Sequence, residues 1–228
     1  MNRRDSLKLF TGAMALAAFA PARALAQAAA PPPAGPFKLP PLGYANDALE
    51  PHIDATTMMI HHDRHHQAFI TNLNGLVPKW ADLATMPVET IMADPSKIPE
   101  AVRGPVRNNL GGHFNHTFFW ELMTPGGAKE PTGELKSAID AMGGLAGVSE
   151  KVNAAGMARF GSGWAWLVVN KDKKLDVVST PNQDTPLELG AKPIIGVDVW
   201  EHAYYLKRGF NSRNLTGRCC DTMRYDCR

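Results

Sequence analysis

Histidines gather in two short segments of this sequence, and a third segment pairs a histidine with an aspartate. Six of the eight histidines lie within residues 61–66 and 113–116. Residues 198–202 (Asp-Val-Trp-Glu-His) add a carboxylate and an imidazole four positions apart. Imidazole is the commonest protein ligand for metals near neutral pH, and carboxylate prefers harder ions. Together the three segments predict a site of imidazoles and one carboxylate for a first-row ion such as manganese or iron.

Other interpretations start from the same residues. A single histidine is more often a packed or solvated side chain than a ligand, and spacing does not decide which histidine of each cluster binds. A di-iron helical bundle needs a Glu-x-x-His motif on each of two helices, and neither histidine segment has one. The three cysteines, Cys219, Cys220 and Cys227, form no Cys-x-x-Cys pair. A thiolate zinc site is therefore not expected.

Helices are predicted to hold both histidine clusters. Residues 54–76 contain no proline and one late glycine, which favours a long helix in which histidines four apart share a face. Residues 102–121 predict a second helix, although Gly111 and Gly112 lie in its middle. A glycine there costs about 1 kcal/mol relative to alanine. The pair therefore predicts that another group approaches this backbone closely.

The second half of the chain predicts a small sheet. Helices are expected at residues 134–142 and 149–160, and strands at 164–169, 175–179 and 194–199. The expected fold class is α+β: a long N-terminal helical hairpin, followed by an α/β part with a small three-stranded antiparallel sheet. The break at Thr-Pro-Gly-Gly divides an N-terminal domain, residues 37–122, from a C-terminal domain, residues 123–228.

The first 26 residues have the pattern of a signal peptide of the twin-arginine type. Arg3 and Arg4 precede an apolar run over residues 9–20, and a small-x-small cleavage signal, Ala-Leu-Ala, ends at Ala26. The run is too short to cross a hydrocarbon core of ~30 Å, so no stable membrane span is expected after signal removal. A Pro/Ala-rich linker follows at residues 27–36. The pattern predicts an exported, periplasmic or extracytoplasmic protein.

Charge gives no reason to expect a nucleic-acid partner. The 228 residues carry a formal net charge of +2, with 24 basic and 22 acidic residues. Without the leader residues Arg3, Arg4, Lys8, Arg23 and Asp5, 20 basic and 21 acidic residues are left. A chain this close to neutrality lacks the basic excess typical of nucleic-acid binding.

Five motifs follow one another along the chain: Leu-Glu-Pro-His-Ile at 49–53, His-His-x-x-His-His at 61–66, Gly-Gly-His-Phe-Asn-His at 111–116, Gly-Ser-Gly-Trp-Ala-Trp at 161–166 and Asp-Val-Trp-Glu-His-Ala-Tyr-Tyr at 198–205. In order and spacing they resemble the iron/manganese superoxide dismutases, most of all the manganese type. The resemblance covers residues 37–207.

The resemblance implies one metal ion per chain, bound by His61, His116, Asp198 and His202. It implies manganese, with iron as the alternative, because Gln183 and Gly112 occupy positions that distinguish manganese enzymes. Gln183 is implied to hydrogen-bond solvent at the metal. Four further residues are implied to surround the ligands: Trp164, Trp200, Glu201 and Gly112.

The same resemblance implies an enzyme, a superoxide dismutase that converts superoxide to oxygen and hydrogen peroxide. His65 and Tyr205 match residues that pair across a dimer interface at the substrate funnel. Glu201 matches one that reaches the opposite subunit's ligand histidine. A homodimer or homotetramer is therefore implied.

Two departures from the family pattern matter. The family usually has a tyrosine where Phe69 stands, so the ring is kept and a hydroxyl that relays protons is lost. After Lys207 the family's aromatic-rich ending fades into a tail that carries all three cysteines. These departures leave one alternative open: a non-catalytic manganese- or iron-binding protein of the same fold.

Overall fold

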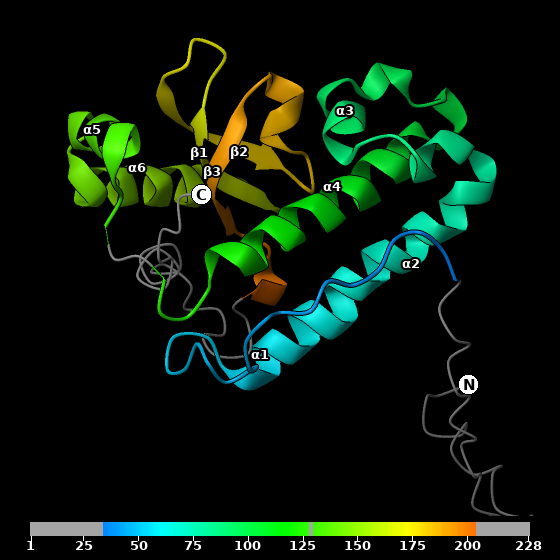
Figure 1. The fold of residues 1–228 in the computed structure, drawn as a ribbon, viewed down its shortest axis with the longest axis horizontal. Coiled ribbons are helices and arrows are strands. Elements are labelled where there is room, and N and C mark those ends of the chain that lie inside the picture. The colour runs from blue at the N-terminus through cyan, green and yellow to red at the C-terminus, as the bar shows by residue number, and fades with distance from the viewer. Residues whose placement is uncertain (1–33, 128–129, 204–228) are drawn as a thin grey trace, which may run out of the picture. The chain divides into compact units, whose positions relative to one another are not determined.

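A helical hairpin forms the first part of the chain in the computed structural model, which describes residues 34–127 and 130–203 (Figure 1). α1 (Ala55–Ile60), the π-helical segment η2 (His61–His66) and α2 (Gln67–Leu76) follow one another without a break. α4 (Glu100–Leu122) packs alongside α2. The two predicted histidine-bearing helices are thus confirmed and lie side by side.

The first of these helices differs from the prediction in one respect. Asp54 caps its start as expected of an N-cap residue, because its carboxylate accepts a hydrogen bond from the Thr57 amide at 2.9 Å. Its middle, however, is the π-helical segment η2, which carries the whole first histidine cluster. Such wider turns are rare and recur at functional sites, where they re-aim side chains.

Short elements connect the two arms of the hairpin: η3 (Val77–Lys79), η4 (Ala81–Ala84), α3 (Val88–Ala93) and η5 (Pro95–Lys97). Sequence periodicity does not predict them, because each offers at most six residues of pattern. Ile91 and Met92 of α3 are fully buried and join Leu73 and Val106 in a separate hydrophobic cluster at this end of the hairpin.

The second part contains the predicted sheet. Two helices come first, α5 (Gly133–Ala141) and α6 (Gly144–Ala158). The strands are β1 (Gly163–Val169), β2 (Leu175–Pro181) and β3 (Lys192–Asp198), antiparallel in the order β2-β1-β3. A 3-10 turn η6 (Pro186–Leu189) precedes β3, and another, η7 (Glu201–Ala203), follows it. The predicted fold class is confirmed.

The central strand explains the order of the sheet. β1 reads Gly-Trp-Ala-Trp-Leu-Val-Val and is buried along almost its whole length, as expected for a strand with partners on both edges. β2 is more exposed and lies at an edge. The large core joins β1 to Phe119 and Trp120 of α4, and β3 also packs on α4. α4 is therefore shared by the hairpin and the sheet.

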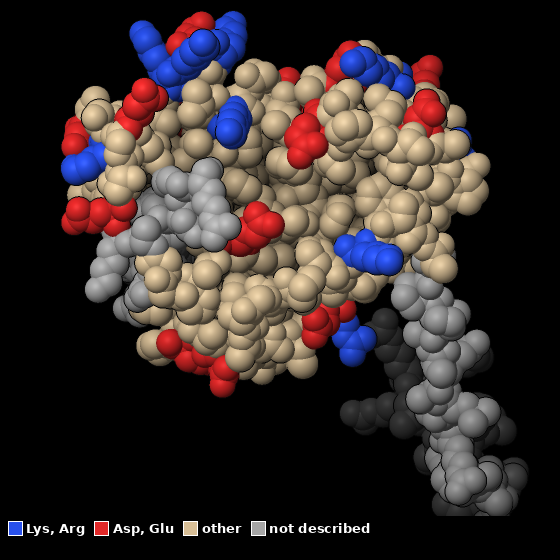
Figure 2. Space-filling view, in the orientation of Figure 1, with Lys and Arg blue, Asp and Glu red and all other residues tan. Residues whose placement is uncertain are grey.

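The surface is mixed in charge. Figure 2 shows acidic and basic side chains interspersed on the visible face, without an extended patch of one sign. Across residues 34–127 and 130–203, no helix combines the length and the apolar character needed to cross a membrane.

Candidate metal centre

Two buried imidazoles meet where the arms of the hairpin pack together. His61 lies in η2 and His116 in α4, with exposed fractions of 2% and 0%. The Nδ1 of His116 lies 2.7 Å from the carbonyl oxygen of Gly112. A carbonyl only accepts, so this nitrogen carries the proton and Nε2 keeps its lone pair. That Nε2 lies 3.0 Å from the Nε2 of His61.

The carboxylate and the third imidazole come from the end of the sheet. Asp198 is the last residue of β3, and His202 lies in η7. The amide of Trp200 donates to Asp198 Oδ1 at 2.8 Å, which orients the carboxylate. Asp198 Oδ2 then lies 3.1 Å from His61 Nε2 and 3.4 Å from His202 Nε2.

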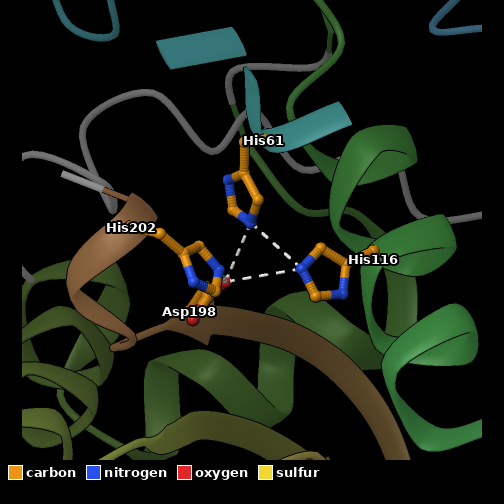
Figure 3. A group of neighbouring side chains, drawn as sticks. All are labelled: His61, His116, Asp198 and His202. Carbon is orange, nitrogen blue, oxygen red and sulfur yellow. Dashed lines mark hydrogen bonds and ion pairs between the residues drawn. The ribbon is translucent and has the colours of Figure 1, made fainter. Parts of the chain in front are cut away.

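The four side chains converge on one point (Figure 3). Their ligand atoms, from His61, His116, Asp198 and His202, all lie within 4.8 Å of one another. Despite the short distances, two of these buried atoms, Asp198 Oδ2 and His202 Nε2, make no hydrogen bond of good geometry with the described residues. Buried polar atoms without partners are costly. Three nitrogens and one oxygen aimed at a common centre fit a single manganese or iron ion.

The electrostatics keep two of the imidazoles neutral. Burial lowers the pKa of His61, and it lowers the pKa of His116 to about 3, with His61 as a further cause. Burial by itself raises the pKa of the Asp198 carboxyl, but the imidazoles of His202 and His61 outweigh it and hold the pKa below its usual range. Three lone-pair donors and one carboxylate anion are the forms that bind a metal.

The predicted glutamine lies beside this cluster. Gln183 is 1% exposed, and its Oε1 accepts a hydrogen bond from Trp164 Nε1 at 3.1 Å. Asn115, next to His116 on α4, donates to the main-chain carbonyl of Gln183 at 3.2 Å. The Nε2 of Gln183 is buried and has no partner among the described residues. It is a hydrogen-bond donor available to a molecule in the site.

The glycine pair of α4 is explained by two close approaches, as predicted. A Cβ on Gly112 would lie 2.7 Å from the ring of Phe69 on α2. A Cβ on Gly111 would collide with the carbonyl oxygen of Gln183. The Phe69 ring lies 5.3 Å from the ring of His116. Phe69 therefore lies beside His116, and the predicted effect of its missing hydroxyl concerns this site.

Tryptophans line the cluster on two sides. The ring of Trp164 is fully buried and meets His116 edge-on, 5.3 Å between centroids. Trp200 stacks on His202 at 5.6 Å, and its Nε1 donates to the Asn182 carbonyl at 3.0 Å. Both rings contact candidate ligands, and their role around a bound metal stays a prediction.

The remaining predicted residues have different outcomes. His65 is half-buried and stacks on His202 with 4.3 Å between ring centroids, so it lies at the site. Glu201 is exposed in the single chain, and its predicted contact with the opposite subunit is not tested by one chain. Tyr205 lies outside the described residues. The roles predicted for Glu201 and Tyr205 at an interface stay predictions.

A histidine network beside the site was missed by the sequence analysis. Trp120 Nε1 donates to His66 Nδ1 at 3.0 Å, and His66 Nε2 lies 2.8 Å from His113 Nδ1. Because indole nitrogen only donates, the proton of neutral His66 lies on Nε2 and is given to His113. His66 also stacks on His116. The motif spacing contains these residues, but only the packing of η2 on α4 shows that they pair.

Comparison with known proteins agrees with this geometry. The family model "Iron/manganese superoxide dismutases, alpha-hairpin domain" matches residues 36–124, and the model of the C-terminal domain of the same family matches residues 131–218. The match therefore extends beyond Lys207, where the motif-level resemblance was expected to end.

Curated relatives share more than half of their aligned residues with the chain. "Superoxide dismutase [Mn]" of Thermus aquaticus is 58% identical over 173 residues, 75% of this chain and 85% of that protein. "Superoxide dismutase [Mn/Fe]" of Methylomonas sp. (strain J) is 55% identical over 172 residues, with the same coverage. "Superoxide dismutase [Mn]" of Listeria innocua is 54% identical, again over 75% of this chain and 85% of that protein. With these matches, the fold and the converging ligand set, the chain belongs to the iron/manganese superoxide dismutases.

Proposed function

We propose that the chain is a superoxide dismutase that holds one manganese ion, with iron as the alternative metal. The main support for the proposal is that the ligand atoms of His61, His116, Asp198 and His202 lie within 4.8 Å of one another. Two of these atoms are buried and have no hydrogen-bond partner among the described residues. Manganese is supported by the relatives in Thermus and Listeria, which are named for it, and iron by the relative named for both metals.

When bound, the metal supplies one-electron chemistry, so that two superoxide ions and two protons yield one oxygen and one hydrogen peroxide. The chain's residues prepare the site for this reaction. The Gly112 carbonyl fixes the tautomer of His116. The Nε2 of Gln183 offers a hydrogen-bond donor, and Trp164 covers one side and excludes water.

The test combines metal analysis with a turnover assay on the same sample. The chain without its first 26 residues, loaded with manganese, is expected to hold one ion and to accelerate superoxide decay. His61→Ala should lose both properties, whereas His52→Gln, at an exposed histidine, should keep both. Bound metal without turnover would support the non-catalytic binding protein instead. Two metals per chain would support the di-iron bundle.

A homo-oligomer, dimeric or tetrameric, is the assembly proposed for this chain. Its support is the surface near the centre, where Glu201 is exposed and His65 is half-buried. Phe160 is 94% exposed, and an interface between copies of the chain would remove this apolar surface from water. The segment after it is tied to the site, because the Gly163 carbonyl accepts from the Val199 amide at 3.0 Å.

Export by the twin-arginine route is proposed from the leader, which lies outside the described residues. In a bacterial host with this pathway, the full chain is expected in the periplasm with its leader cleaved after Ala26. Replacing both arginines, Arg3→Lys with Arg4→Lys, should leave the precursor in the cytoplasm. Fractionation and mass spectrometry check both outcomes, and periplasmic mature protein from the double variant would exclude this route.

A further inference from the structure

An ion cluster ties α4 to the segment that carries Gln183. Arg107 of α4 donates from Nε and Nη2 to Oε2 of Glu188, at 2.9 and 2.6 Å. The same Nη2 lies 2.9 Å from Oδ2 of Asp184, the residue after Gln183. One guanidinium therefore holds two carboxylates of the 183–188 segment, which is loop and 3-10 turn rather than strand.

Arg107 is the first of three contacts along one face of α4. Residues 107, 111 and 115 are spaced by four positions and so lie above one another on the helix. Gly111 leaves room for the Gln183 carbonyl to approach the helix, and Asn115 donates to that same carbonyl at 3.2 Å. The next residue, His116, is a candidate ligand. This face of α4 thus sets the place of Gln183 relative to the metal cluster.

The two carboxylates repel each other once the arginine is removed. The side chains of Asp184 and Glu188 are only 19% and 12% exposed, so solvent screens them poorly. Burial and the negative charge of Glu188 raise the pKa of Asp184, and Arg107 opposes both. Without the guanidinium, the segment would relieve this repulsion by moving away from α4 and would carry the Gln183 main chain with it.

The position of the Gln183 main chain decides where its amide points. Oε1 is anchored on Trp164, whereas the buried Nε2 has no hydrogen-bond partner within residues 34–127 and 130–203. We propose that Arg107 is a positioning residue for superoxide turnover, because its bridge to Asp184 and Glu188 fixes where Gln183 presents Nε2 to the metal site. The inference rests on the proposed function, since it requires Gln183 to act there.

The test uses the manganese-loaded chain and three variants. Gln183→Ala removes the side-chain amide, and its effect is the reference for the other variants. It is expected to lower kcat/KM by about 10- to 100-fold. Arg107→Gln, which acts through Gln183, should lower kcat/KM by about 3- to 10-fold at unchanged metal content. It should also shift the midpoint potential of the manganese couple in the same direction as Gln183→Ala. Arg107→Lys keeps the charge and should recover part of both changes.

Arg103→Gln is the matched control, because Arg103 lies one turn earlier on α4 and bonds the carbonyls of Pro95 and Ile98 instead. It should leave turnover and potential unchanged. If Arg107→Gln does not fold, Glu188→Gln removes the Glu188 arm of the bridge and should give smaller shifts in the same direction, because Arg107 still holds Asp184 and the repulsion between the two carboxylates is gone. Unchanged turnover and potential in a bridge variant would overturn the inference, as would a loss that only follows metal content.

Failure of the proposed function has a different signature. An unmodified, manganese-loaded chain without turnover would reject the function. The midpoint potential would still decide the inference in that case, because a bridge that positions Gln183 changes the potential whether or not superoxide is consumed.

Discussion

The carboxylate of Asp198 lies buried among three imidazoles, and its Oδ2 has no hydrogen bond of good geometry with the described residues. A metal shared by these ligands would add to the stabilisation that the imidazoles already give this anion. A bound ion therefore belongs to the energetics of folding as well as to the chemistry, since a ligand that binds only the native state stabilises it.

Metal removal is expected to destabilise the protein. Free metal at 1,000 times its dissociation constant contributes about 4 kcal/mol, which corresponds to a fall in Tm of about 8–16 °C for a chain of this size on removal. Scanning calorimetry with and without a chelator measures it. Asp198→Asn should show a much smaller difference between the two conditions, and equal Tm values for the unmodified protein would contradict the prediction.

Phe69 is a second residue whose role can be tested, here by adding a single oxygen atom to its side chain. Phe69→Tyr restores the hydroxyl next to His116 and Gly112. It is expected to raise turnover at high superoxide flux by improving proton delivery, with metal content unchanged. Stopped-flow measurement of superoxide decay provides the test, and Phe69→Leu, which adds no hydroxyl, should bring no gain. Equal turnover for Phe69 and the tyrosine variant at high flux would reject the relay.

At the residue scale, the sequence predicted the side chains that metal binding requires. It did not predict contacts that depend only on how helices and loops pack together. Residue type predicted a site of imidazoles and one carboxylate, and the resemblance to the family named the four side chains. The pairing of Trp120 with His66, and the bridge from Arg107 to Glu188, were not predicted. Residues 107 and 188 are far apart in sequence, and neither forms part of a motif that names the other.

Among the elements, α4 is the one that connects the hairpin, the sheet and the candidate metal site. It packs on α2, supplies His116 and contacts β3, and its glycines admit a ring on one side and a carbonyl on the other. The sequence predicted the helix and the close approach, because glycine in a helix interior is costly without a reason. It did not predict the π-helical segment η2 opposite, because a π turn leaves no distinct hydrophobic period.

Element boundaries were predicted less well where glycine intervenes. The helix expected at 149–160 begins at Gly144, because Gly143 (φ 98°) and Gly144 (φ 71°) adopt left-handed backbone just at its start. The sequence analysis assigned no role to glycine at this position. In the structure it turns the chain sharply from α5 into α6.

Gly112→Ala tests the close approach on α4. The added Cβ would meet the Phe69 ring at 2.7 Å, and overpacking of this kind costs about 1–3 kcal/mol. Gly104→Ala on the same helix is the control, since nothing lies within 4 Å of its Cβ. That change should stabilise the protein by about 0.4–1 kcal/mol. Urea unfolding of both variants gives the comparison, and a neutral or stabilising effect of Gly112→Ala would contradict the packing argument.

At the scale of the whole molecule, Phe160 is the residue on which to test assembly. Phe160→Glu should shift the protein toward monomer in analytical ultracentrifugation, because a carboxylate cannot be buried without a partner. Leu189→Glu changes another large apolar side chain, 57% exposed, on a different element, and should leave the assembly intact. A wild-type chain that sediments as a monomer would end the oligomer proposal.

The four candidate ligands are divided between the hairpin and the far end of the sheet, and this has a consequence for biosynthesis. A ribosome completes α4 well before it reaches β3, so a nascent chain at that point offers His61 and His116 alone. Two imidazoles bind a metal ion weakly, and the site with all four ligands forms only when the chain folds. The choice of metal is therefore made in the compartment where folding finishes. The twin-arginine route carries folded chains, so for export by that route, as proposed, the cytoplasmic supply would decide which metal the protein carries into the periplasm.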